Sequence, residues 1–289
     1  MMEKIGAIDM MNYTLQCVPE TGQRLYDEYE DWQFVERTYG MTWPWPGTHS
    51  TVDEMIAEMD EIGFDKIVMS APKMWLQNKT LGQIGSVEII RDVVEKSNGR
   101  VIGAATYNPF DIPGSLREID IAVKEWGFRM VYHHGETFDL ALNDKRFYPC
   151  YTKCYELGIP VSMQTGHSGE ILPSWGGRPI YLDSVAIDFP DLKIILSHTG
   201  WPWVEEWIAM VRKHPNVYGD ISAWPPKALP KMSPTIYDFM QTSWGQKKVL
   251  FGTNAQGLRR CLKQFMELPV SDEVKKAVLR DNAIKVLGL

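Results

Sequence analysis

Residues 192–223 read LKIILSHTGWPWVEEWIAMVRKHPNVYGDISA. The runs 193–197 and 216–220 are apolar and rich in β-branched residues, which predicts two buried strands, and the segment 202–213 between them predicts a helix. A strand, a helix and a second strand in this order form the repeating unit of parallel α/β folds. The stretch therefore predicts a parallel sheet whose outer face is covered by helices.

The same unit recurs along the chain. We predict strands at 4–9, 66–70, 101–106, 129–133, 160–164, 193–197, 216–220 and 248–252. We predict helices at 51–62, 85–97, 114–126, 144–157, 180–188, 202–213, 233–243, 257–267 and 271–287. Eight strands alternating with helices predict a (β/α)8 TIM barrel. An open doubly wound sheet is the alternative, but AIDMMNYT at 7–14 lacks a glycine-rich phosphate turn after the first strand.

The length of 289 residues suits a single barrel domain over 1–289, because no linker or repeat divides the chain. The segment 14–50 is expected to be a lid or binding loop inserted after the first strand. The net charge of −7 argues against nucleic acid or an anionic membrane as a partner. We see no membrane-spanning apolar run, signal peptide or disulfide framework, so we expect a cytoplasmic protein.

The active site of a TIM barrel is built from residues at the carboxyl ends of the strands. The predicted strands present polar or titratable residues there: Asp9, Tyr13, Ser70, Lys73, Tyr107, Asn108, Tyr132, His133, His134, Gln164, His167, His198, Asp220, Ser222, Thr253 and Asn254. Four of the six histidines in the chain belong to this set. This concentration predicts a functional site at that end of the barrel.

Four landmarks follow one another along the chain: GIPVSMQTGHSG at 158–169, SWGGRPIYLDSVAIDFPDL at 174–192, the segment 192–223, and VLFGTNAQ at 249–256. Together they resemble the amidohydrolase-related family of TIM barrels, also called the aminocarboxymuconate-semialdehyde-decarboxylase-like group. The resemblance covers nearly the whole chain. It implies a hydrolase or carboxy-lyase with a small-molecule substrate, often with one divalent metal, and a homo-oligomer such as a dimer or tetramer.

The resemblance also implies a metal site made of His-x-His after the first strand, one His after each of the fifth and sixth strands, and Asp after the eighth. Only His198 matches, since the other positions read Met11, Tyr13, Gln164 and Asn254. Amides do not balance the charge of a divalent ion, and thioethers prefer soft metals. We therefore expect no metal ligands and no cofactor. A weakly bound divalent metal, held by a neighbouring histidine, is the alternative.

Three functions fit these residues. The first is a metal-independent hydrolase that acts on a small carbonyl or carboxylate substrate, lactone-like or with an activated C–C bond, through His-centred acid–base catalysis. Its catalytic candidates are His198, His167, Asp9, Tyr132 and His133. The alternatives are a carboxy-lyase and a non-catalytic protein that binds a ligand in the inherited site. We favour the hydrolase because acid–base and amide groups remain at the strand ends.

Other side chains are candidates for substrate binding. Arg178 is predicted to clamp a carboxylate, because a guanidinium matches its geometry, with a loop-ordering salt bridge as the alternative. Gln164 and Asn254 are predicted to hold a carbonyl oxygen by hydrogen bonds. The remaining candidates for contact with an apolar or planar substrate are Met11, Tyr13, Trp175 and Trp203. His133 and His134 are adjacent and point to opposite faces of an extended segment, so at most one faces the site.

Overall fold

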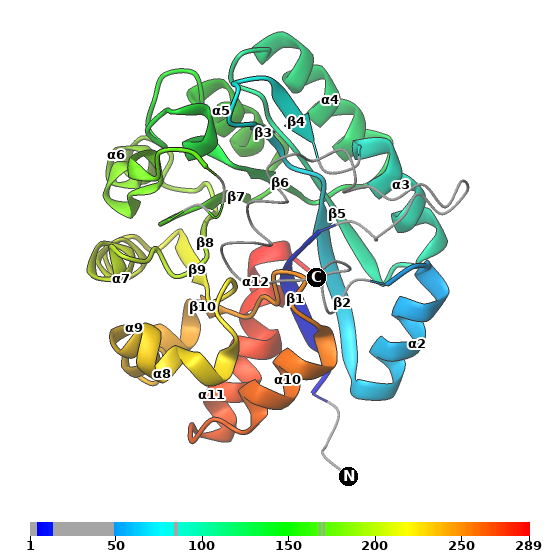
Figure 1. The fold of residues 1–289 in the computed structure, drawn as a ribbon, viewed down its shortest axis with the longest axis vertical. Helices are drawn as coiled ribbons and strands as arrows, with labels where there is room; N and C mark the ends of the chain where they lie inside the picture. The colour runs from blue at the N-terminus through cyan, green and yellow to red at the C-terminus, as the bar shows by residue number, and fades with distance from the viewer. Residues whose placement is uncertain (1–4, 14–48, 84–85, 168, 170) are drawn as a thin grey trace.

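The computed structural model describes residues 5–13, 49–83, 86–167, 169 and 171–289, so nearly all of the expected lid segment 14–50 lies outside the described residues. Within them, one sheet has eight parallel strands in the order β1-β2-β5-β6-β7-β8-β9-β10 (Figure 1). The strands are β1 (Ala7–Tyr13), β2 (Phe64–Ser70), β5 (Val101–Ala105), β6 (Met130–His133), β7 (Val161–Gln164), β8 (Ile194–Ser197), β9 (Val217–Asp220) and β10 (Val249–Leu250). Helices alternate with the strands around the outside, which confirms the predicted (β/α)8 TIM barrel.

The helices begin where the sequence supplies caps. Thr51, Ser86 and Asp111 each accept a hydrogen bond from a backbone amide in the first turn of the helix that follows. The described helices are α2 (Val52–Ile62), α3 (Val87–Lys96), α4 (Ile112–Lys124), α5 (Tyr148–Leu157), α6 (Leu182–Asp188), α7 (Val204–Lys213), α8 (Leu229–Met232), α9 (Pro234–Phe239), α10 (Leu258–Met266), α11 (Asp272–Lys276) and α12 (Asn282–Leu287). In the described part of the chain, no helix is both long enough and apolar enough to cross a membrane.

The gap between the first and last strands is bridged by backbone hydrogen bonds at the carboxyl end. The amide of Met10 donates to the carbonyl oxygen of Phe251 over 2.9 Å, and the amide of Asn254 donates to the carbonyl oxygen of Met11 over 2.9 Å. These bonds close the barrel beside the turn that follows β10. They also fix Asn254 next to Met11, although the two residues are far apart in sequence.

Two apolar layers hold the barrel together. The larger lies between the sheet and the helices, and it includes Met59 of α2, Trp207 of α7 and Phe265 of α10. The second fills the inside of the barrel with Ile8, Met10, Val68, Ile102, Ala104, Met130, Tyr132, Ile195, Tyr218 and Leu250, joined by residues of α12. Because side chains fill the interior, a substrate has to bind at the carboxyl ends of the strands.

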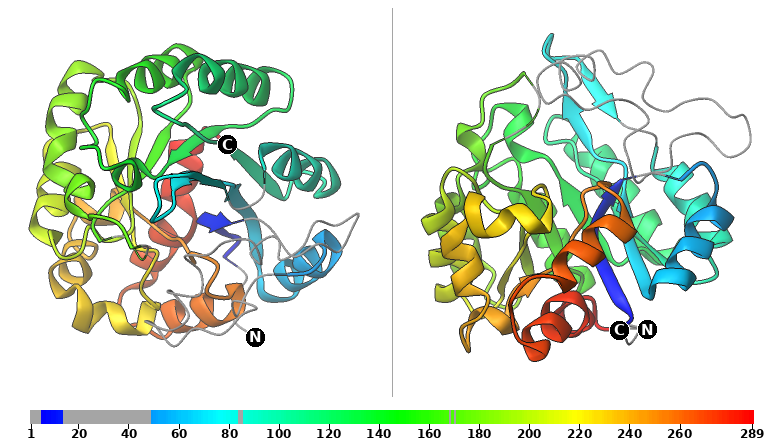
Figure 2. Two further views of the ribbon diagram at one scale, coloured as in Figure 1. Left: turned by 45° about the horizontal axis from the view of Figure 1, so that its top comes forward. Right: turned by 60° about the horizontal axis from the view of Figure 1, so that its bottom comes forward.

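The structure corrects several predicted boundaries. β1 does not end at residue 9 but continues to Tyr13, and β10 has only two residues. The helix predicted at 271–287 is divided by a π-helical turn at 277–281. A hairpin of β3 (Lys73–Trp75) and β4 (Leu81–Gln83) was not predicted, since three-residue strands leave little periodicity to detect. It projects from the end of the barrel opposite the C-terminus (Figure 2).

Candidate active site

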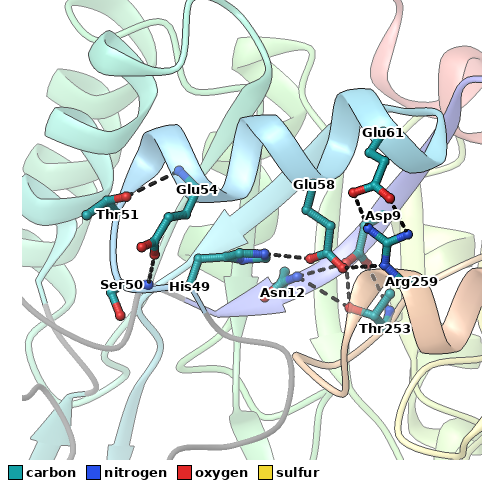
Figure 3. Close-up of polar contacts among 10 residues, drawn as sticks. All are labelled: Asp9, Asn12, His49, Ser50, Thr51, Glu54, Glu58, Glu61, Thr253 and Arg259. Carbon is teal, nitrogen blue, oxygen red and sulfur yellow. Dashed lines mark hydrogen bonds and ion pairs between the residues drawn. The ribbon is translucent and has the colours of Figure 1, made fainter.

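The end of β1 contains a bulge. The pairing of β1 with β2 shifts between Asp9 and Asn12, so the usual alternation of inward and outward side chains is reset there. Asp9 holds this bulge. Its Oδ1 accepts hydrogen bonds from the amides of Met11 (3.1 Å) and Thr253 (2.8 Å). Its Oδ2 accepts from Asn12 Nδ2 (2.9 Å) and Thr253 Oγ1 (2.6 Å) (Figure 3).

These bonds give Asp9 a positioning role. Complete burial raises its pKa to about 6, and the hydrogen bonds from Thr253, Asn12 and Met11 oppose that rise. Both carboxylate oxygens accept hydrogen bonds from protein donors, so Asp9 is not among the groups available to contact a substrate. Asp9 instead joins the end of β1 to the turn that carries Asn254.

Because of the bulge, Met11 and Tyr13 join Ile8 and Met10 in the inner layer. Gly252 makes room for Met11, since a Cβ added at this glycine would lie 3.0 Å from Met11 Cβ and 2.8 Å from Ser222 Cβ. Tyr13 is hydrogen-bonded to the hydroxyl of Tyr132 across the barrel. Of the two residues in the positions of the expected His-x-His, Met11 therefore lies beside the turn after β10, and Tyr13 contacts Tyr132 of β6.

His198 follows β8 in a left-handed backbone conformation with φ of 68°. In β8, Ile194 and Leu196 belong to the outer layer and Ile195 to the inner layer, so regular alternation would direct residue 198 outward. The positive φ redirects the ring, at a cost of about 1–3 kcal/mol for a non-glycine residue. Asp220 Oδ1 accepts the His198 amide over 3.0 Å and so holds this conformation.

The imidazole of His198 is held at both nitrogens. Its Nδ1 lies 2.7 Å from Ser222 Oγ, and its Nε2 lies 3.1 Å from Gln164 Oε1. The Ser222 hydroxyl donates to Asp220 Oδ1 in a very short hydrogen bond. Asp220 also accepts from Ser197 Oγ over 2.7 Å, so this buried carboxylate is well supplied with donors. Burial lowers the pKa of His198, and the charge of Asp220 acts in the opposite direction.

The hydrogen-bonded chain continues to β6. Tyr132 Oη donates to Gln164 Oε1 over 3.3 Å and lies 2.8 Å from His134 Nε2. Burial raises the pKa of the Tyr132 hydroxyl well above 10, so it remains protonated. Burial lowers the pKa of His134 well below 6.5, with further contributions from His198 and His133. One buried network thus connects His134, Tyr132, Gln164, His198 and, through Ser222, Asp220.

The family described as amidohydrolase has a model that matches residues 46–289. The chain belongs to the amidohydrolase family. This confirms the resemblance carried by the four sequence landmarks, because all of them lie inside the matched range.

Solved structures with the same fold cover almost the whole chain. An uncharacterized TIM-barrel protein from Bordetella bronchiseptica is 23% identical over 98% of both chains, with a TM-score of 0.77. The 5-carboxyvanillate decarboxylase from Sphingomonas paucimobilis is 17% identical over 99% of both chains, with a TM-score of 0.67. A probable 2-pyrone-4,6-dicarboxylic acid hydrolase from Acinetobacter baumannii, solved with citric acid, is 14% identical, with coverage of 98% of this chain and 100% of that chain and a TM-score of 0.64. No curated protein sequence matches this chain.

The metal site implied by family resemblance does not fit this amidohydrolase. Among the described residues, no group of three or more His, Cys, Asp or Glu side chains is placed to hold a metal ion. The corresponding positions are Met11, Tyr13, Gln164 and Asn254, which bring no negative charge. The matching His198 already has a protein partner at each ring nitrogen. No chemical step is therefore assigned to a metal.

The structure separates the remaining histidine candidates. His133 faces the helices, where its ring stacks on Phe147 with centroids 4.8 Å apart and an angle of 10°. Complete burial there lowers its pKa to about 3. His167 lies beyond β7, 3.2 Å from Ser174 Oγ through Nδ1 and edge-on to Trp201. Neither ring belongs to the buried network. The second histidine of the buried network is His134.

The loop candidates for substrate binding are engaged with protein groups. Arg178 forms a salt bridge with Glu206 of α7, and its guanidinium lies over the Trp203 ring at 5.8 Å from the centroid. Trp175 Nε1 donates to Asp139 Oδ1 over 2.9 Å. These contacts correspond to the loop-ordering interpretation of Arg178, because the guanidinium is already paired with a carboxylate.

Two parts of the network did not stand out from the sequence. Asp220 and Ser222 are strand-end residues, yet the sequence did not show that they act together on His198. Their spacing of two is a usable signal, because residues two apart at a strand end share one face of the sheet. His134 was one member of an adjacent pair, and the inward direction of Tyr132 and the stacking of His133 on Phe147 decide between the two histidines.

Proposed function

We propose that this amidohydrolase is a metal-independent hydrolase of a small carbonyl or carboxylate compound, with a lactone as the preferred substrate class. The observation that carries the proposal is the arrangement at His198, where Ser222 meets Nδ1 and in turn donates to Asp220. A histidine whose Nδ1 is oriented by a polar partner has a defined tautomer, and its Nε2 is directed for proton transfer.

In this mechanism, His198 Nε2 takes a proton from a water molecule. The water oxygen attacks the carbonyl carbon, the ring C–O bond breaks, and the imidazolium returns the proton to the leaving oxygen. Asp220 stabilises the imidazolium through Ser222, as the carboxylate of a catalytic triad does. A lactone suits a site without a Lewis acid, because it is more readily attacked than an amide.

The developing negative charge on the carbonyl oxygen needs donors in place of a metal. Tyr132 remains protonated because of its burial, so its hydroxyl is a donor within the network and not a base. Gln164 has an amide within the same network, and Asn254 lies in the turn after β10 with a φ of 50°. Fixed donors in a buried site stabilise an oxyanion more strongly than water does.

The second candidate is a carboxy-lyase that releases CO₂. The fold supports it, because 5-carboxyvanillate decarboxylase from Sphingomonas paucimobilis shares the barrel. A protonated His198 would then supply a proton to the carbon that loses the carboxylate. The lactone proposal takes precedence because the decarboxylation needs an electron sink, which the donors of this site do not provide. A ligand-binding protein without turnover is the third possibility.

The test uses purified full-length protein, dialysed against a chelator and assayed with 2-pyrone-4,6-dicarboxylate, 5-carboxyvanillate and 2,6-dihydroxybenzoate. Ring opening without CO₂ release, unaffected by added zinc or manganese and reduced about 10²–10⁴-fold in His198→Ala, supports the proposal. Release of CO₂ identifies the protein as a carboxy-lyase. Activity that depends on one equivalent of metal overturns the metal-independent mechanism. Tight binding without turnover identifies a ligand-binding protein.

We also propose that the chain acts as a homo-oligomer in the cytoplasm and has neither nucleic acid nor membrane as a partner. The formal charge of −7 supports the second part, because nucleic acid and anionic lipid repel a negatively charged protein. Sedimentation equilibrium of the purified protein distinguishes a monomer from a dimer or tetramer.

A further inference from the structure

The buried network contains one histidine that the proposed reaction has not used. His134 is only 2% exposed, and its Nδ1 has no hydrogen-bond partner among the residues that the structure describes. Buried polar atoms in native proteins nearly always have a partner, so an unpartnered one requires an explanation. Ser70 Oγ and Asn254 Oδ1 are also buried without a partner in the described part of the chain. Ser70 is the last residue of β2, and Asn254 lies in the turn after β10.

The Nε2 side of the His134 ring is held by Tyr132. Its Nε2 lies 2.8 Å from Tyr132 Oη, and the two rings meet edge to face at 85° with centroids 5.1 Å apart. Tyr132 Oη in turn contacts Gln164 Oε1, which lies 3.1 Å from His198 Nε2. The proton positions of the two histidines are therefore linked through Tyr132 and Gln164.

Counting protons along this chain fixes the tautomer of His134. Ser222 has one hydroxyl proton, which it donates to Asp220, so His198 donates to Ser222 from Nδ1. A neutral His198 then has a lone pair on Nε2, and the Gln164 amide has to present its N–H groups to that nitrogen and to Tyr132 Oη. With Tyr13 as the donor to Tyr132 Oη, the Tyr132 proton points to His134 Nε2. The proton of His134 is left on Nδ1, the nitrogen without a partner.

The reverse orientation of the Gln164 amide corresponds to the protonated form of His198. The structure places Gln164 Oε1 toward both His198 Nε2 and Tyr132 Oη. With the Ser222 proton used by Asp220, this orientation requires protons on both nitrogens of His198. It is the arrangement expected after His198 has taken a proton from water. The orientation of the Gln164 amide is therefore expected to follow the charge of His198.

We propose that His134 is a second catalytic histidine, whose Nδ1–H donates to the carbonyl oxygen of the substrate while His198 Nε2 accepts the proton from water. This inference rests on the proposed function and deepens it. A neutral imidazole is a suitable electrophile when burial keeps it uncharged, and the surroundings of His134 favour this state. Burial, the neighbouring His133 and His198, which follows β8, each lower its pKa, and Tyr132 lies against its Nε2.

The first experiment needs no substrate. Protein labelled with ¹⁵N-histidine is studied by long-range ¹H–¹⁵N NMR from pH 5 to pH 8.5, and the variants His134→Asn and His198→Gln assign the two rings. We expect His134 to remain neutral throughout and to be the Nδ1–H tautomer where His198 is neutral. In Gln164→Leu the tautomer becomes independent of the charge of His198. A cationic His134 at neutral pH, or an Nε2–H tautomer beside neutral His198, overturns the inference.

The second experiment measures turnover of the lactone. His134→Ala is expected to lower kcat about 10²–10³-fold, as the loss of one oxyanion donor does. His134→Asn keeps an N–H near the position of Nδ1 and is expected to recover at least tenfold of that loss. His214→Gln is the control, because His214, which follows α7, is also buried but pairs with Asp183 of α6. Equal kcat for His134→Ala and wild type overturns this inference alone, whereas absence of wild-type turnover overturns the proposed function as well.

Discussion

Asp9 and Thr253 join the first and last strands of the barrel through two hydrogen bonds, one to each carboxylate oxygen. The Thr253 amide lies 2.8 Å from Oδ1, and the Thr253 hydroxyl lies 2.6 Å from Oδ2. These bonds hold the turn with Asn254 against the bulge that presents Met11 and Tyr13. Nearby, Arg259 of α10 pairs with Glu61 of α2, so the helices on both sides of this junction are also joined (Figure 3).

The stability of the protein is expected to depend on the ionisation of Asp9. Its pKa is raised from 3.8 to about 6 in the fold, so the fold favours the protonated form. This contribution is complete below pH 3.8 and is lost as the pH rises through 6, and the shift corresponds to about 3 kcal/mol. Urea unfolding of wild type and Asp9→Asn at pH 4–7 measures it. The stability of wild type relative to the variant should rise as the pH falls, and the opposite slope contradicts this account.

Asp220 is expected to control the pH range in which His198 acts as a base. Its carboxylate raises the pKa of the imidazole by stabilising the cation. In Asp220→Asn that pKa falls, so the acid limb of the kcat/KM profile moves to lower pH. Asp183→Asn is the control, because Asp183 pairs with His214 outside the network. An unchanged limb in Asp220→Asn means that the carboxylate does not act on His198.

The barrel was predictable because its signals are local. Each apolar strand such as 193–197 is followed by a helix with its own pattern, and eight repeats of that unit leave few alternative folds. The extension of β1 to Tyr13 was not predictable. It depends on Asp9 meeting Thr253 at the other end of the chain, and no local pattern encodes that contact.

The candidate site was predictable as a set of positions and less so as a network. The carboxyl ends of the strands were the right place, and His198 and Gln164 do meet there. The directions of side chains depend on backbone details outside strand alternation, such as the positive φ of His198. For the same reason, the choice between His133 and His134 required the observed stacking of His133 on Phe147.

Substitution of Arg178 tests whether this residue binds the carboxylate of a substrate or forms a structural ion pair. Its guanidinium is paired with Glu206 and lies over Trp203, so we expect Arg178→Lys to change KM for a carboxylate substrate by less than about threefold. Loss of a true clamp would raise KM about tenfold or more. Steady-state kinetics of Arg178→Lys and Glu206→Gln on one substrate make the comparison. A large rise in KM confined to Arg178→Lys would restore the clamp that the sequence predicted.

The substitution Gly252→Ala tests whether the close packing of Met11 and Ser222 around residue 252 matters for catalysis. In Gly252→Ala the new Cβ would lie 2.8 Å from Ser222 Cβ and 3.0 Å from Met11 Cβ, so one of them has to move. A moved Ser222 no longer orients His198 Nδ1, and kcat is expected to fall by more than the loss of folded protein explains. Gly219→Ala is the control for overpacking away from the site, since its Cβ would meet the Trp207 ring in the outer layer. Gly252→Ala should cost about 1–3 kcal/mol of unfolding free energy, as overpacking does, and Gly219→Ala should cost more, because its Cβ would lie 1.9 Å from Trp207 Cζ2. Only Gly252→Ala should reduce kcat per folded molecule and shift its pH profile, and equal kcat values for the two variants would show that Ser222 tolerates displacement.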